Sequence, residues 1–88
     1  MHFGIIRERK NPPDRRVVLS PKACQKVVEN HEDAQITVEP SIIRVFTDKE
    51  YKTAGITVDS KMEECDVLLG VKEVPIDALI SNKKYLFF

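Results

Sequence analysis

Two arginines stand next to an apolar run, where a folded chain could hold them over a ligand. Arg15 and Arg16 directly precede residues 17–19, and Ser20-Pro21 follows. A guanidinium is a planar fork that matches a carboxylate at two points, and a helix start adds a partial positive field. Arg16 is therefore a candidate for binding an anionic small molecule. Composition alone favours the plainer alternative, a solvated loop arginine paired with Asp14 or Glu8.

A lysine occupies a comparable place later in the chain. Lys72 ends the apolar run "VLLGV" and is followed by Glu73. Partial burial lowers the pKa of a lysine amine, which lets it polarise a carbonyl or exchange a proton near neutral pH. Glu73 opposes that change because it stabilises the charged form. A lysine that extends to solvent and pairs with Glu73 explains the spacing equally well.

Short apolar and helical patterns alternate along the chain and would have to position these side chains. The patterns predict strands at 2–7, 34–40, 56–59, 66–72 and 84–88, and helical segments after Ser20, at 47–54, 60–65 and 75–80. Residues 41–46 are ambiguous between a strand and an irregular segment. Such alternation predicts an α/β fold with a mostly parallel sheet, and sites in these sheets gather at the carboxyl ends of strands.

Composition narrows the function classes. The chain has 88 residues with a net charge of zero, 42% hydrophobic and 32% charged residues, which indicates one small soluble domain. The basic excess of nucleic-acid binders and the long apolar run of a membrane span are both missing. Cys24 and Cys65 have no partner at metal-ligand spacing, so two buried free thiols in a cytoplasmic protein are expected. The three glycines are scattered singly and form no dinucleotide-binding motif.

Three blocks in order resemble one enzyme family. They are "GIIRERKNPPDRRVVLSP", "DKEYKTAGITV" and "DVLLGVKEVP", and they resemble the N-terminal domain of alanine dehydrogenases, pyridine nucleotide transhydrogenases and lysine-forming saccharopine dehydrogenases. The Gly-x-Lys-Glu-x-Pro form at residues 70–75 favours the saccharopine dehydrogenase-like branch. Alanine dehydrogenase, converting alanine to pyruvate and ammonia, is the alternative within the family.

The resemblance implies a fold and roles for individual residues. It implies a three-layer Rossmann-like (flavodoxin-like) domain, here truncated, in an enzyme that uses NAD or NADP for hydride transfer at a carbon bonded to nitrogen. Arg16 corresponds to the arginine that binds a substrate carboxylate. Lys72 corresponds to the catalytic lysine near the reacting carbon, and Glu73 to its acidic neighbour at the substrate. Arg15 would at most assist.

Residues 1–88 are accordingly expected to be a fragment of the N-terminal substrate-binding domain, without the nucleotide-binding domain and inactive alone. The family's catalytic histidine is expected beyond Phe88. The expected partner is an amino-acid or 2-oxo-acid substrate, with no nucleic acid, membrane, metal or bound cofactor, and a homo-oligomer is compatible with this reading. Two alternatives stay open: a non-catalytic α/β module that binds a small anion or a protein, and a structural domain whose charged strand ends are incidental.

Overall fold

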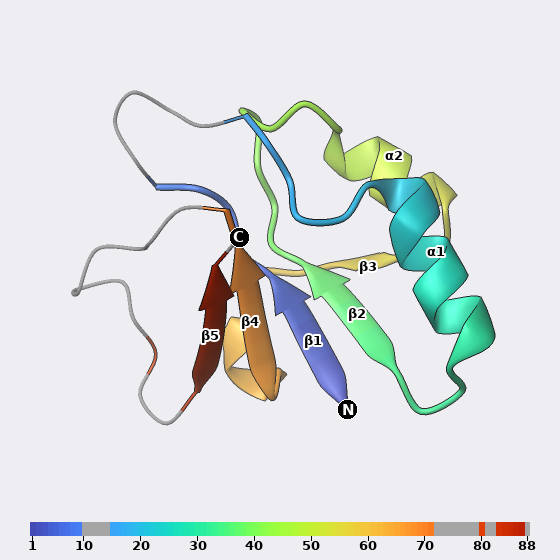
Figure 1. The fold of residues 1–88 in the computed structure, drawn as a ribbon. Helices are drawn as coiled ribbons and strands as arrows, with labels where there is room; N and C mark the ends of the chain where they lie inside the picture. Colours follow the sequence, from blue (N-terminus) through green and yellow to red (C-terminus); the bar gives the residue numbers. More distant parts are fainter. Residues whose placement is uncertain (10–14, 72–79, 81–82, 88) are drawn as a thin grey trace.

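The computed structural model describes residues 1–9, 15–71, 80 and 83–87. Figure 1 shows strands and helices alternating along the chain. In order, the elements are β1 (His2–Ile5), α1 (Pro21–Asn30), β2 (Gln35–Val38), α2 (Asp48–Thr53), β3 (Thr57–Val58), the 3-10 helix η1 (Met62–Glu64), β4 (Val67–Gly70) and β5 (Lys84–Phe87).

All five strands form one parallel sheet in the order β3-β2-β1-β4-β5. In the register, Ile5 of β1 lies opposite Val38 of β2 and Leu69 of β4. The carboxyl ends of these three central strands are therefore level. This arrangement confirms the predicted Rossmann-like α/β class.

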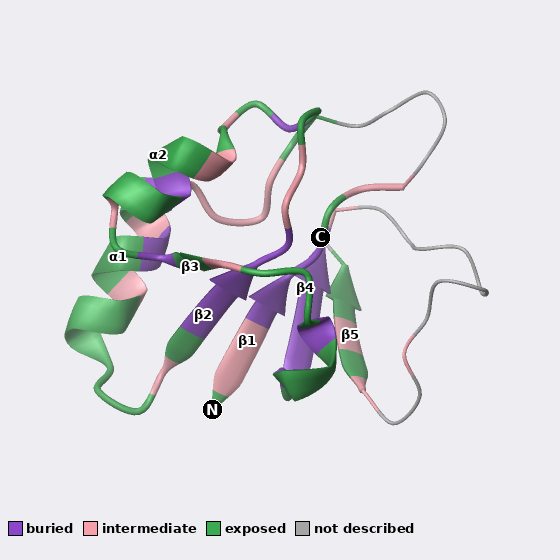
Figure 2. Cartoon of the chain, turned by 180° about the vertical axis from the view of Figure 1, so that it is seen from behind, coloured by how far each residue is buried: buried purple, intermediate pink, exposed green. Residues whose placement is uncertain are grey.

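The two faces of the sheet carry separate apolar cores. Successive strand residues point to opposite faces, so Ile5 and Ile6 enter different clusters. Ile5 packs with Cys24 of α1 and with Tyr51 of α2. On the other face, Ile6 packs with a cluster that joins η1 to β4, whose members are Met62, Cys65 and Leu68. β4 is buried along its whole length (Figure 2), as its near-continuous apolar sequence predicts.

Both helices begin where their capping residues predict. The Ser20 hydroxyl accepts a hydrogen bond from the Ala23 amide at 3.2 Å, and Pro21 occupies the first turn of α1. At α2, Thr47 and Glu50 form the reciprocal capping box. Gly55 follows α2 with a φ of 82°, a left-handed conformation that favours glycine.

The structure resolves one ambiguity and differs from the sequence-based expectation in two places. Residues 41–46, ambiguous between a strand and an irregular segment, form a series of bends and no strand. β5 has the apolar sequence typical of a buried strand, but it lies at the sheet edge, with Leu86 50% and Phe87 36% exposed. In α1, Cys24 and Val27 pack in the core, whereas Val28 and His31, which continue the same helical spacing, are exposed. The helix predicted at 75–80 falls almost wholly outside the described residues.

The two cysteines are free and buried, as expected. Burial raises the pKa of Cys24 to about 11 from its ordinary 9.0, and it also raises the pKa of the Cys65 thiol. Burial, reinforced by the charge of Cys24, raises the pKa of the Tyr51 hydroxyl to about 12 from 10.0, although Arg44 opposes the change.

These raised pKa values predict a loss of stability at alkaline pH. Unfolding exposes the groups, so the unfolded chain releases protons at a lower pH than the folded chain does. Their stabilising contribution is complete below pH 9 and is lost as the pH rises towards about 11 for Cys24 and about 12 for Tyr51. Urea unfolding between pH 8 and 11 should show falling stability, with the decline reduced in Cys24→Ala. An equally steep decline in that variant would contradict the assignment to Cys24.

Candidate functional site at the carboxyl edge of the sheet

The sheet order predicts a crevice between β1 and β4. The chain leaves β1 through α1 to β2 on one side, and later returns from β3 to β4 on the other side. Neighbouring connections that leave a parallel sheet in opposite directions open a crevice at the carboxyl ends of the strands, where ligands of this fold class bind. The exits of β1 and β4 form the two sides of this crevice.

The exits of β1 and β4 are joined directly. Ile6 donates its backbone N–H to the Leu69 carbonyl at 3.0 Å, which continues the sheet ladder past β1. Beyond it, the carboxylate of Glu8 accepts the Val71 amide at 3.1 Å. Val71 directly precedes Lys72. Glu8 therefore holds the backbone of Val71, the residue that precedes the predicted catalytic lysine in the sequence.

A buried carboxylate ties the exits of β1 and β2. Glu39 is only 8% exposed. Its Oε1 accepts the Arg7 amide at 2.8 Å, and its Oε2 pairs with the Arg9 guanidinium at 2.7 Å. Because its charge is matched and hydrogen-bonded, burial of this carboxylate is tolerated. Arg9 and Glu39 also reach a cavity of about 210 Å³ whose other lining residues are Ile6, Ser60, Met62, Glu63, Leu68, Ile80 and Tyr85.

The predicted substrate-binding arginine lies in a segment held against the loop after β2. Arg16 is exposed. The carbonyl of its neighbour Arg15 accepts a hydrogen bond from the Val45 amide at 2.8 Å. The Arg15 Nε–H donates to the Ile43 carbonyl at 3.2 Å. Arg15 thus anchors the segment through its side chain and backbone. The sequence-based suggestion that Arg15 assists at the substrate is not tested by these contacts.

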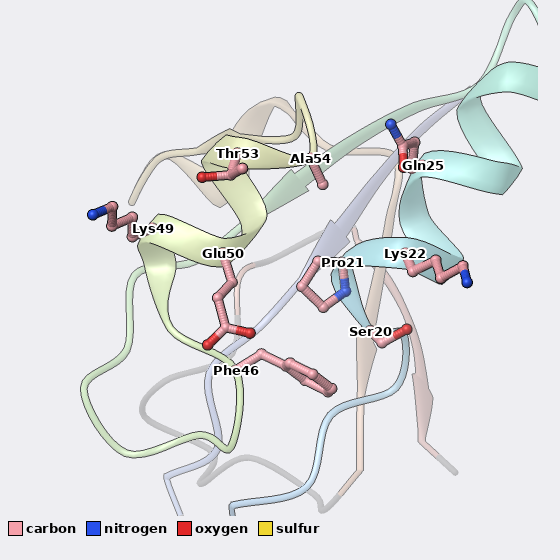
Figure 3. Close-up of a pocket in the computed structure, with 9 residues that line it drawn as sticks. All are labelled: Ser20, Pro21, Lys22, Gln25, Phe46, Lys49, Glu50, Thr53 and Ala54. Carbon is pink, nitrogen blue, oxygen red and sulfur yellow. The ribbon is translucent and has the colours of Figure 1, made fainter.

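An open groove lies beside this segment, between the start of α1 and α2. It has a volume of about 730 Å³ and is lined by Ser20, Pro21, Lys22, Gln25, Phe46, Lys49, Glu50, Thr53 and Ala54. Figure 3 shows Glu50 and Phe46 on the α2 side of the groove, and Ser20, Pro21 and Lys22 at the start of α1 on the other. Among the residues the structure describes, no buried side-chain polar atom lacks a hydrogen-bond partner.

Two of the predicted site residues cannot be placed. Lys72 and Glu73 lie outside the described residues, so their convergence with Arg16 stays a prediction. Glu8, Glu39 and Arg44 organise this edge; sequence reasoning passed over Glu39 and Arg44 and named Glu8 only as an ion-pair partner of Arg16. Arg44 had a detectable signal, since it is a single charge within the apolar run "SIIRVF" with Asp48 four residues later.

Comparison with known proteins agrees with this architecture. Residues 4–88 match the family described as "Alanine dehydrogenase/PNT, N-terminal domain". The chain belongs to this family. The resemblance inferred from the three sequence blocks is thereby confirmed.

Relatives of this chain include proteins named alpha-aminoadipic semialdehyde synthase from mammals and from a plant. The chain is 35% identical over 86 residues to alpha-aminoadipic semialdehyde synthase, mitochondrial, of Rattus norvegicus, covering 98% of the chain and 9% of the relative. It is 33% identical over 86 residues to the Bos taurus protein of the same name, with the same coverage. To the Arabidopsis thaliana alpha-aminoadipic semialdehyde synthase it is 28% identical over 89 residues, covering 97% of the chain and 8% of the relative. The chain thus spans less than a tenth of the length of these relatives.

Proposed function

We propose that this chain is the substrate-binding N-terminal part of an NAD(P)-dependent amino-acid oxidoreductase of the saccharopine dehydrogenase-like branch, active in lysine metabolism. The reaction would be hydride transfer at a carbon bonded to nitrogen. The observation that carries the proposal is that 97–98% of the chain aligns, at 28–35% identity, with proteins named alpha-aminoadipic semialdehyde synthase from a plant and from mammals. The Gly-x-Lys-Glu-x-Pro block at residues 70–75 supports the same branch.

The proposal assigns separate roles to the predicted residues. Arg16 binds a substrate carboxylate through its guanidinium fork. Lys72 acts at the reacting carbon, where its amine polarises the carbonyl or imine or transfers a proton. Glu73 moderates the positive charge there. The bond between Glu8 and the Val71 amide supports this reading, because it fixes the backbone just before Lys72 at the crevice.

This chain does not fit a dinucleotide cofactor itself. A dinucleotide pyrophosphate needs a tight glycine-containing turn between the first strand and its helix. Here the connection runs from residue 6 to residue 20 and contains no glycine. We therefore assign the binding of NAD or NADP to another part of the complete enzyme, and we expect the 88-residue chain alone to be inactive.

Further observations concern the cellular compartment of the protein and a second candidate substrate. Among the described residues, no helix has the length and apolar character needed to cross a membrane. The composition favours a cytoplasmic protein, whereas the names of the mammalian relatives include the word mitochondrial. The family description also names alanine dehydrogenase, so alanine and pyruvate belong among the test ligands.

Titration of the isotope-labelled chain tests the substrate-binding role. We expect 2-oxoglutarate, lysine or saccharopine to shift the amide resonances of residues 15–20 and 70–73, and pyruvate to act more weakly. Arg16→Gln should raise the dissociation constant about 10- to 100-fold, as expected for the loss of a charge-assisted hydrogen bond. Lys26→Gln, which removes an exposed cation from α1, is the matched control and should leave the constant unchanged.

Two results would contradict the proposal. If none of the ligands shifts resonances near Arg16 and Lys72, the chain has no preformed substrate pocket. If Arg16→Gln and Lys26→Gln weaken binding equally, the arginine contributes only general charge. A stronger response to pyruvate than to the longer ligands would favour the alanine dehydrogenase alternative.

A further inference from the structure

Arg44 has an environment unlike that of the other arginines the structure describes. It is only 8% exposed. Its Nη1 donates to the Glu39 carbonyl at 2.5 Å, its Nε donates to the Phe46 carbonyl at 2.9 Å, and its Nη2 pairs with the carboxylate of Asp48. The guanidinium lies over the Tyr51 ring, with Cζ 4.7 Å from the ring centroid. Every guanidinium nitrogen therefore already has a partner within the protein.

These contacts shape the loop between β2 and α2. Arg44 links the residue after β2, Glu39, to the first residue of α2, Asp48, and to Phe46 between them. The loop is thus folded around a buried cation. Ile42 and Val45 are 102% and 53% exposed, whereas Phe46 packs against the core. Apart from Phe46, hydrogen bonds hold the loop conformation: those of Arg44 and those that the Ser41 hydroxyl accepts from the Ile43 and Arg44 amides.

The loop in turn holds the segment that carries Arg16. Next to Arg44, the Val45 amide donates to the Arg15 carbonyl, and the Ile43 carbonyl accepts the Arg15 Nε–H. Arg44 therefore lies between the two loop residues that grip Arg15. Arg16 is the next residue along the chain.

The other end of the same segment, at Leu19, is held by Tyr51, whose ring lies beneath the Arg44 guanidinium. The Tyr51 hydroxyl donates to the Leu19 carbonyl at 2.7 Å, and the ring of Tyr51 supports the guanidinium of Arg44. The segment 15–19 is consequently anchored at both ends, at Arg15 by the loop that Arg44 holds and at Leu19 by Tyr51. The segment between the anchors is short, so the backbone of Arg16 has little freedom.

We propose that Arg44 is a positioning residue: its buried guanidinium, acting through the loop at residues 41–46, holds Arg16 in the orientation that binds a substrate carboxylate. The inference rests on the proposed function for the role of Arg16. The link from Arg44 through the loop to residues 15–19, which we call the brace, rests on the hydrogen bonds described above. Arg44 does not touch substrate, and its effect on binding passes through Arg16.

Arg44→Lys is the informative variant. It keeps the charge but loses the planar fork, so one ammonium cannot replace donors that reach three separate partners. Hydrogen exchange without ligand tests the brace. The Val45 amide should exchange about 10-fold faster or more in the variant, relative to the Ile6 amide that donates to Leu69 in the sheet ladder. An unchanged ratio would overturn the proposal.

A double-mutant cycle with 2-oxoglutarate tests the link to Arg16. We expect Arg44→Lys to raise the dissociation constant about 5- to 10-fold in the wild-type background and to have no further effect in Arg16→Gln, because coupled residues are not additive. A purely structural Arg44 would leave the constant of the folded protein unchanged, or would weaken both backgrounds equally. Either result rejects the positioning role.

The cycle separates the two proposals. If Arg16→Gln leaves binding unchanged, the proposed function fails at its carboxylate contact. If Arg16→Gln weakens binding and Arg44→Lys does not, only the positioning role fails. Should Arg44→Lys not fold, Tyr51→Phe removes the bond to the Leu19 carbonyl and keeps the ring. It is expected to weaken binding about 2- to 5-fold, again only when Arg16 is present, and additive weakening would reject the proposal.

Discussion

Replacing Lys72 with methionine is expected to lower the turnover of the proposed complete oxidoreductase about 100- to 10,000-fold, the range that general acid–base catalysis contributes. Methionine keeps the length and the apolar stem of lysine but removes the amine that would polarise the carbon or carry the proton. Substrate affinity should change much less, since Arg16 would still hold the carboxylate. Steady-state kinetics with the amino-acid substrate and nicotinamide cofactor measures both quantities.

The control for this substitution is Lys84→Met. Lys84 is exposed at the start of β5, so its replacement removes the same charge without touching the crevice. It should leave turnover unchanged. Circular dichroism of both variants establishes that the fold persists. Unchanged turnover in Lys72→Met would remove this lysine from the mechanism.

The fold could largely be predicted because local signals and long-range packing agree. Ser20-Pro21 and the Thr47–Glu50 capping box mark helix starts, and the structure confirms both. The continuous apolar run of β4 predicts a central strand of a parallel sheet, and β4 pairs with a parallel strand on each side. Such agreement between levels is typical of natural sequences.

The burial of β5 could not be predicted from its local sequence. Its sequence, "KYLF", has the apolar character of a buried strand. Whether such a strand is buried depends on which elements cover it, and local sequence does not specify this. In the part of the chain that the structure describes, β5 pairs with β4 alone and remains half-exposed at Leu86.

The site was only partly predictable for a related reason. Arg16 and Lys72 stay predictions, drawn from the apolar blocks that they precede or follow and from the family resemblance. Arg44 was not predicted, because its role depends on contacts with Glu39 and Tyr51 that a linear pattern does not contain. Glu39 likewise reads as an ordinary strand-end acid, although it is buried and joins the exits of β1 and β2.

The largest stability effect is expected at Tyr51. Its side chain is fully buried and meets the Phe46 ring edge-on, with centroids 6.5 Å apart. Truncating a buried aromatic residue to alanine costs about 3–5 kcal/mol. A domain of this size is expected to have a total stability of only roughly 4–13 kcal/mol. Tyr51→Ala should therefore remove much of the free energy of unfolding.

The matched variant Tyr51→Phe separates packing from hydrogen bonding. It retains the ring beneath Arg44 but leaves the Leu19 carbonyl without the hydroxyl donor, which should cost about 1–3 kcal/mol. Urea unfolding followed by circular dichroism measures both changes. A loss below about 1 kcal/mol in Tyr51→Ala would mean that this ring does not anchor the core. Equal losses in the two variants would instead place nearly all of its contribution in the hydroxyl, and thus in the anchoring of residues 15–19 rather than in the packing of α2 against the sheet.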